Sequence, residues 1–176
     1  MLIKHLNLYT RIIIISFLFT SCTTGNISKL DELPRIIGSV NDYYNLLTKE
    51  QNEYLKNKLQ SIFLQTRTNI VILIVNSTNG ISIENYASQI MNSTKMEISM
   101  SPEILFVYAM DDRKLRLEVT GESELLLSNE LCQQIVENIV ESFKQGNYFQ
   151  GIKEGIIQVQ VILMNNINLK TTPNKA

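Results

Sequence analysis

Histidine is almost absent from this sequence. His5 is the sole histidine, and it lies within an N-terminal segment that has the pattern of a cleavable signal. Once that segment is removed, the chain cannot form a Ser-His-Asp or Cys-His catalytic site, a histidine phosphate carrier or an ordinary zinc site. Any chemistry must therefore use carboxylates, hydroxyls, lysine, arginine or a metal bound through oxygen.

Cysteine is also scarce, and Cys22 ends the N-terminal segment. Lys4 and Arg11 supply positive charge before a run of apolar residues, interrupted by one serine, at 12–19, and small residues precede the cysteine. This order is typical of a secretory signal and resembles the motif read by lipoprotein-processing enzymes. We therefore expect removal of residues 1–21 and lipidation of Cys22, for example with palmitate.

An uncleaved anchor and a plain secretory signal are the alternatives for this segment. As a helix, residues 12–19 would span about 12 Å, against roughly 30 Å of hydrocarbon. Extending the helix back to Leu2 would place Lys4 and Arg11 in the bilayer, which is costly. With Cys22 lipidated, Cys132 is left without a disulfide partner, and its apolar neighbours predict a small buried hydrophobe.

Clustered positive charge and further long apolar runs are missing too. The leader carries two of the 16 basic residues and none of the 17 acidic ones, so the remaining 155 residues have a net charge of −3. No basic patch stands out, which argues against nucleic acid as a partner. We expect a cell-envelope protein on an extracytoplasmic membrane surface, anchored through Cys22 and associated with membrane or envelope proteins.

The remaining chain predicts one domain between two unstructured segments. Residues 22–39 have the polar, Gly- and Pro-containing composition of a lipidated tether, and residues 165–176 form a disordered tail. Between them, helical and strand patterns alternate over residues 40–164. The expected class is α/β, a three-layer α/β/α sandwich with a small mixed β-sheet. Capping residues begin helices at Thr48, Ser82 and Ser128, and strands are expected at 69–75, 104–110 and 115–119.

Aspartates are few, and three of the four that follow the leader lie near predicted element ends: Asp42, Asp111 and Asp112. Two carboxylates at the end of a strand could bind Ca²⁺ or Mg²⁺, or pair a raised-pKa acid with an ionised base. Ordinary turn chemistry explains the same residues, because Asx side chains bond to nearby backbone. Arg113 could hold a phosphate or pair with a neighbouring carboxylate. Glu124, in a loop after the third strand, is a further oxygen donor.

Four stretches, in order, resemble the TPM-domain family, whose members include photosystem II repair proteins and a receptor modulator. The stretches are Val40–Thr48, Asn69–Val75 with Ile83–Ala87, Asp111–Val119, and Phe143–Ile152. The family follows its Asp-Asp-Arg strand with a glycine-rich segment. Here the matching positions read Thr120-Gly121-Glu122-Ser123-Glu124-Leu125, of which Glu124 alone matches.

The resemblance implies two functions from different classes. One is a membrane-anchored, non-enzymatic module for assembly, repair or regulation of other proteins, which the tether, the missing histidine and the altered glycine segment favour. The other is a divalent-metal-dependent acid phosphatase-like hydrolase. It would use Asp111, Asp112 and Arg113 as catalytic candidates and Asp42, Asp111, Asp112 and Glu124 as ligands for Ca²⁺ or Mg²⁺.

Overall fold

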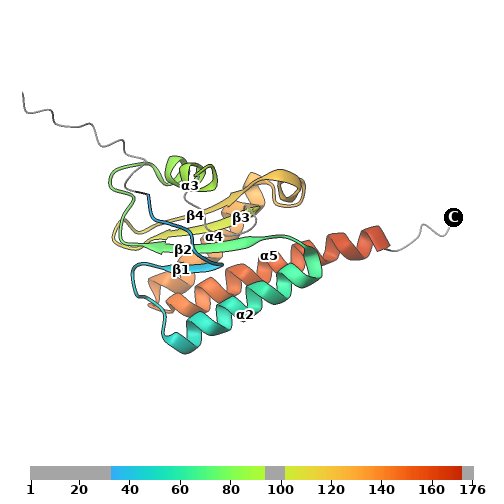
Figure 1. The fold of residues 1–176 in the computed structure, drawn as a ribbon, viewed down its shortest axis with the longest axis horizontal. Coiled ribbons are helices and arrows are strands. Elements are labelled where there is room, and N and C mark those ends of the chain that lie inside the picture. Colours follow the sequence, from blue (N-terminus) through green and yellow to red (C-terminus); the bar gives the residue numbers. More distant parts are fainter. Residues whose placement is uncertain (1–32, 94–101, 172–176) are drawn as a thin grey trace, which may run out of the picture. The chain divides into compact units, whose positions relative to one another are not determined.

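A four-stranded mixed sheet organises the chain in the computed structural model, which describes residues 33–93 and 102–171 (Figure 1). The sheet has the order β1-β2-β3-β4, in which β1, β2 and β3 are parallel and β4 runs antiparallel to β3. All residues of β2 and β3 are buried, as expected for central strands covered on both faces. The strands are β1 (Val40–Asp42), β2 (Ile70–Val75), β3 (Ile104–Ala109) and β4 (Lys114–Val119).

Local capping chemistry begins the helices where the sequence predicts. The hydroxyl of Thr48 accepts from the Gln51 N–H, and the Gln51 side chain accepts from the Thr48 N–H, which completes a capping box. At the starts of two later helices, the hydroxyls of Ser82 and Ser128 accept from the N–H groups of Asn85 and Leu131. The helices are α2 (Lys49–Thr66), α3 (Ile83–Met91), the short 3-10 helix η2 (Gly121–Leu125), α4 (Asn129–Lys144) and α5 (Tyr148–Thr171).

Two separate cores cover the two faces of the sheet, and together they confirm the predicted three-layer sandwich. Alternate strand residues, such as Ile72 and Phe106, pack with α2, α4 and α5 on one face. Their neighbours, such as Leu73 and Val107, pack with α3 on the other face. Figure 1 shows α3 on one side of the sheet and α2 with α5 on the opposite side. Cys132 is buried in the larger core, as predicted.

The positions of α2 and α3 determine the handedness of the two crossover connections between the parallel strands. The steps from β1 to β2 and from β2 to β3 go in the same direction across the sheet, and all three strands are parallel. The connecting helices α2 and α3 nevertheless cover opposite faces. The two crossovers therefore have opposite hands, so one of them departs from the right-handed rule that parallel strands almost always obey.

Packed structure extends beyond both ends of the predicted domain, residues 40–164, into the predicted tether and tail. Leu33 and Ile36, expected within the tether, are buried in the α3-side core. Asn41 ties their segment down: its side-chain oxygen accepts from the N–H groups of Ile37 and Gly38, and its amide donates to carbonyls of Gly38 and Ile72. Sparse apolar residues without periodicity gave no sign of this packing.

At the other end, α5 continues to Thr171, beyond the predicted domain end at residue 164. The leader, Cys22 and most of the predicted loop at 94–102 lie outside the described residues. Within the described ranges, no helix combines the length and apolar character needed to cross a bilayer.

Candidate functional site

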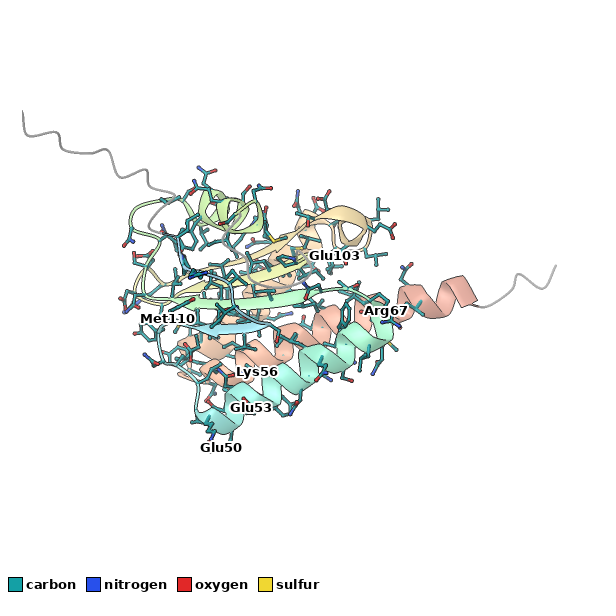
Figure 2. The ribbon with its side chains drawn as sticks, in the orientation of Figure 1. Glu50, Glu53, Lys56, Arg67, Glu103 and Met110 are labelled. Atoms are coloured by element: carbon teal, nitrogen blue, oxygen red, sulfur yellow. The ribbon has the colours of Figure 1, made fainter. Side chains whose placement is uncertain are left out.

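Three loops meet at the carboxyl ends of the parallel strands, the edge where sites of α/β proteins commonly form. They follow β1, β2 and β3. Backbone bonds hold them together: the Met110 and Asp111 N–H groups donate to the carbonyls of Val75 and Asn76, at 3.0 and 2.8 Å. The Met110–Arg113 turn is therefore fastened to the end of β2. In Figure 2, Met110 lies at this end of the sheet and Glu103 at the opposite end.

Asp112 fastens the same turn to the loop after β2. One carboxylate oxygen accepts from the Ser77 hydroxyl at 2.8 Å, and the other accepts from the Thr78 N–H at 2.8 Å and its hydroxyl at 3.0 Å. The Thr78 N–H, followed by the Ser77 hydroxyl, holds the pKa of Asp112 below its usual value. Both oxygens of this catalytic and metal-binding candidate are thus committed to positioning a loop.

Asp42 has the same kind of role in the loop after β1. Its two carboxylate oxygens accept from the N–H groups of Leu46, at 3.1 Å, and Leu47, at 2.8 Å. These bonds close the loop that carries Tyr44 toward α2. Asp42 and Asp112 therefore follow the turn-forming interpretation of the sequence, in which Asx side chains satisfy nearby backbone.

Asp111 and Arg113 are exposed at the tip of the turn. The negative charge of Asp111 raises the pKa of Tyr44, since it disfavours the phenolate beside it. Arg113 has a positive φ of 54°, and within the described residues it forms no ion pair. Of the two roles considered for Arg113, pairing with a neighbouring carboxylate is therefore not the one observed.

Glu124 lies far from these aspartates along the strand direction. It belongs to η2, which follows the end of β4, and the hydroxyl of Ser123 in η2 donates to Glu103 at 3.1 Å. Glu103 marks the opposite end of the sheet from Met110 (Figure 2). Among the described residues no three carboxylate, histidine or cysteine side chains gather closely enough to hold a metal. The four predicted ligands thus do not fit a Ca²⁺ or Mg²⁺ site, which needs several convergent oxygens.

Beside the Asp111 turn is an open groove of about 660 Å³, which we call the edge groove. Phe143 and Tyr148 form an aromatic wall, with their rings edge to face at 5.1 Å between centroids, and Phe143 stacks on the buried Tyr108 behind it at 5.6 Å. Gly146, at φ 77°, makes the sharp α4–α5 turn that brings Tyr148 back to Phe143. The groove is lined by Tyr44, Leu46, Ala109, Met110, Arg113, Lys114, Leu115, Val140, Phe143, Lys144 and Tyr148.

Sequence reasoning missed most of this lining, including Lys114, Val140 and Lys144. One signal was available: three of the four family-like stretches supply the groove. Tyr44 comes from the first, Lys114 from the third, and Lys144 with Tyr148 from the fourth. Residues distant in sequence that share one family pattern are candidates for one site.

The fold is a three-layer α/β domain with an open groove beside the carboxyl ends of its parallel strands. The family model for the TPM domain matches residues 40–162, more than half of the chain. The chain therefore belongs to the TPM-domain family. No curated protein matches it.

Solved structures of three bacterial proteins are similar in fold. The N-terminal domain of a protein from P. gingivalis has a TM-score of 0.64 at 21% identity, covering 80% of this chain and 88% of that one. The BA42 protein from the psychrophilic Bizionia argentinensis has a TM-score of 0.57 at 19% identity, with coverages of 70% and 86%. An N-terminal domain from Corynebacterium glutamicum has a TM-score of 0.52 at 9% identity, with coverages of 78% and 84%.

Proposed function

We propose that this TPM-domain protein is a lipid-anchored, extracytoplasmic module that acts by binding a partner protein in the edge groove, without catalysis. Its role would be assembly, repair or regulation of membrane or envelope proteins. The main support for this proposal is that the aspartates are engaged in loop structure, whereas the groove beside them is open. Asp42 and Asp112 commit their carboxylate oxygens to loop backbone and hydroxyls, whereas the groove is mainly apolar and aromatic, which suits recognition.

Anchoring rests on the N-terminal sequence, with Cys22 as the lipidated residue. Acyl chains contribute about 0.8 kcal/mol per buried CH₂, so two or more chains hold a protein stably at a membrane. We expect labelled palmitate to be incorporated by the wild-type protein in cells and to be lost with Cys22→Ala. A Cys132→Ala variant is the matched control and should retain the label. Label that persists in Cys22→Ala would refute the anchoring.

Hydrolysis of a phosphomonoester is the second candidate, and one observation favours it. Asp111 is exposed beside Tyr44, on the same turn as Arg113, which has no ion pair within the described residues. A carboxylate and a guanidinium so placed could meet a phosphate.

An assay of the chain from residue 22 onward separates the two functions. We expect no turnover of a generic phosphomonoester, with or without Ca²⁺ or Mg²⁺, and no difference between the wild type and Asp111→Asn. Turnover by the wild type that is lost in Asp111→Asn would replace the binding function with the enzymatic one.

A further inference from the structure

Positive charge surrounds the edge groove. The charged side chains in its lining are Arg113, Lys114 and Lys144. Of the nearby acids, Asp112 bonds to the loop after β2, Asp111 lies beside Tyr44, which is part of the lining, and Glu141 pairs with Lys144. The lining thus favours an anionic ligand, although the whole chain is slightly acidic.

These cations are available to a ligand. Lys144 pairs with Glu141 at 2.7 Å, but both side chains are about two-thirds exposed, so the pair is weak and easily exchanged. Arg113 and Lys114 have no carboxylate within ion-pair distance among the described residues. A ligand carboxylate could therefore bind these cations at the cost of only one weak ion pair, between Lys144 and Glu141.

The floor between the cations is apolar, with Leu46, Leu115, Val140 and Phe143 in the lining. A volume of about 660 Å³ falls within the range of about 300–1,000 Å³ typical of ligand sites, and it is large for a lone inorganic ion. The ligand should therefore combine acidic groups with apolar side chains.

One side of the groove is formed by an edge strand. Lys114 and Leu115 begin β4, which is the last strand of the sheet. The outer backbone of an edge strand offers N–H and C=O groups in register for an extended chain. An extended peptide could therefore lie along this side of the groove.

We propose that the edge groove binds an extended segment of a partner protein in which acidic and apolar residues alternate. This inference rests on the proposed function and specifies the partner's chemistry. The carboxylates would meet Arg113, Lys114 and Lys144, and the apolar side chains would lie on Leu115 and Phe143. An anionic membrane surface fits less well, because a flat surface cannot reach the apolar floor of a groove.

NMR titration of the chain from residue 22 onward tests the proposal. Cys22→Ala keeps this chain free of lipid, and both cores lie within residues 33–163. The first probe is a capped octapeptide of alternating glutamate and leucine, and the second replaces each glutamate with glutamine. The third is a vesicle of phosphatidylglycerol.

We expect the glutamate peptide to shift the amide signals of the groove lining and the glutamine peptide to bind at least about tenfold more weakly. Each neutralised cation should weaken binding by about two- to fivefold, as for an exposed ion pair. The test variants are Arg113→Gln and Lys144→Gln. Lys56→Gln is the matched control, because Lys56 forms a similar exposed pair with Glu53, at 3.0 Å, on α2.

Equal binding of the two peptides would overturn the acidic specificity. Shifts away from the groove, or binding to vesicles through Arg113 and Lys144 with none to the peptide, would overturn the peptide proposal. These outcomes would leave the proposed function, partner binding in the edge groove, to be tested separately by cross-linking in cells.

Discussion

Gly155 provides a sensitive test of the packing that supports the edge groove. It lies in α5 where this helix meets α4. A Cβ placed on it would be 2.5 Å from Cδ1 and 2.9 Å from Cγ1 of Ile139, and 3.4 Å from Cε1 of Phe106. Both neighbours are fully buried, so Ile139 has no solvent-filled space into which it could turn.

Two opposing effects set the stability of Gly155→Ala. Replacing glycine in a helix interior favours folding by about 1 kcal/mol. Overfilling a packed core costs about 1–3 kcal/mol. A contact of 2.5 Å in a fully buried place puts the cost in the upper part of that range. We therefore expect the free energy of unfolding to fall by about 1 kcal/mol.

Urea unfolding followed by circular dichroism measures this change, and a double-mutant cycle assigns its cause. Ile139→Val removes the closest atom and should cost about 1 kcal/mol alone. In the Gly155→Ala background, Ile139→Val should cost almost nothing further. The double variant is then about as stable as Gly155→Ala alone, which corresponds to a coupling energy of about 1 kcal/mol. The reasoning fails if Gly155→Ala raises stability by its full helix-propensity gain, or if the two changes simply add.

Four further predictions concern single groups. Asn41→Ala should lower the free energy of unfolding by about 2–3 kcal/mol, because it removes four side-chain bonds to backbone groups, of which the bond to the Ile72 carbonyl is buried and the others are partly buried; chemical denaturation measures this. Tyr108→Phe should raise thermal stability by about 1 kcal/mol, since the buried Tyr108 hydroxyl has no hydrogen-bond partner among the described residues, and an unchanged or lower melting temperature would contradict this. The folded pKa of Asp112 is depressed, so its contribution to stability is present above the unfolded value of about 3.9 and is lost as pH falls through the lower folded value; Asp112→Asn should flatten this acid limb in pH-dependent unfolding. Asp111→Asn should lower the pKa of Tyr44, and a titration of ¹³C-labelled tyrosines that shows no change would place the two groups apart.

Much of the fold could be predicted because it depends on local patterns. The capping residues Thr48, Ser82 and Ser128 satisfy the first N–H groups of their helices, whatever the remaining chain does. The apolar runs of β2 and β3 can be buried on both faces only within a sheet covered by helices. These features led to the correct α/β sandwich.

The packing of Leu33 and Ile36 and the edge groove were beyond this reasoning. Both depend on which segments meet in space: the Asn41 side chain fixes the first, and the ring contact of Phe143 with Tyr148 shapes the second. For the carboxylates, the position in the fold could be predicted but the hydrogen-bond partners could not. Their place at one edge follows for Asp42 and Asp112, but their backbone partners depend on loop geometry that residue spacing does not encode.

Photo-cross-linking in cells tests the central claim most directly. A benzophenone amino acid at Val140, in the groove lining, is compared with one at Lys58, which is half-buried on α2 and outside the groove lining. The account predicts one defined partner protein cross-linked from Val140, none from Lys58, and loss of the cross-link with Arg113→Gln and Lys144→Gln together. Equal cross-linking from both positions would contradict partner binding in the groove, and a groove cross-link that persists without the two cations would contradict the acidic partner alone.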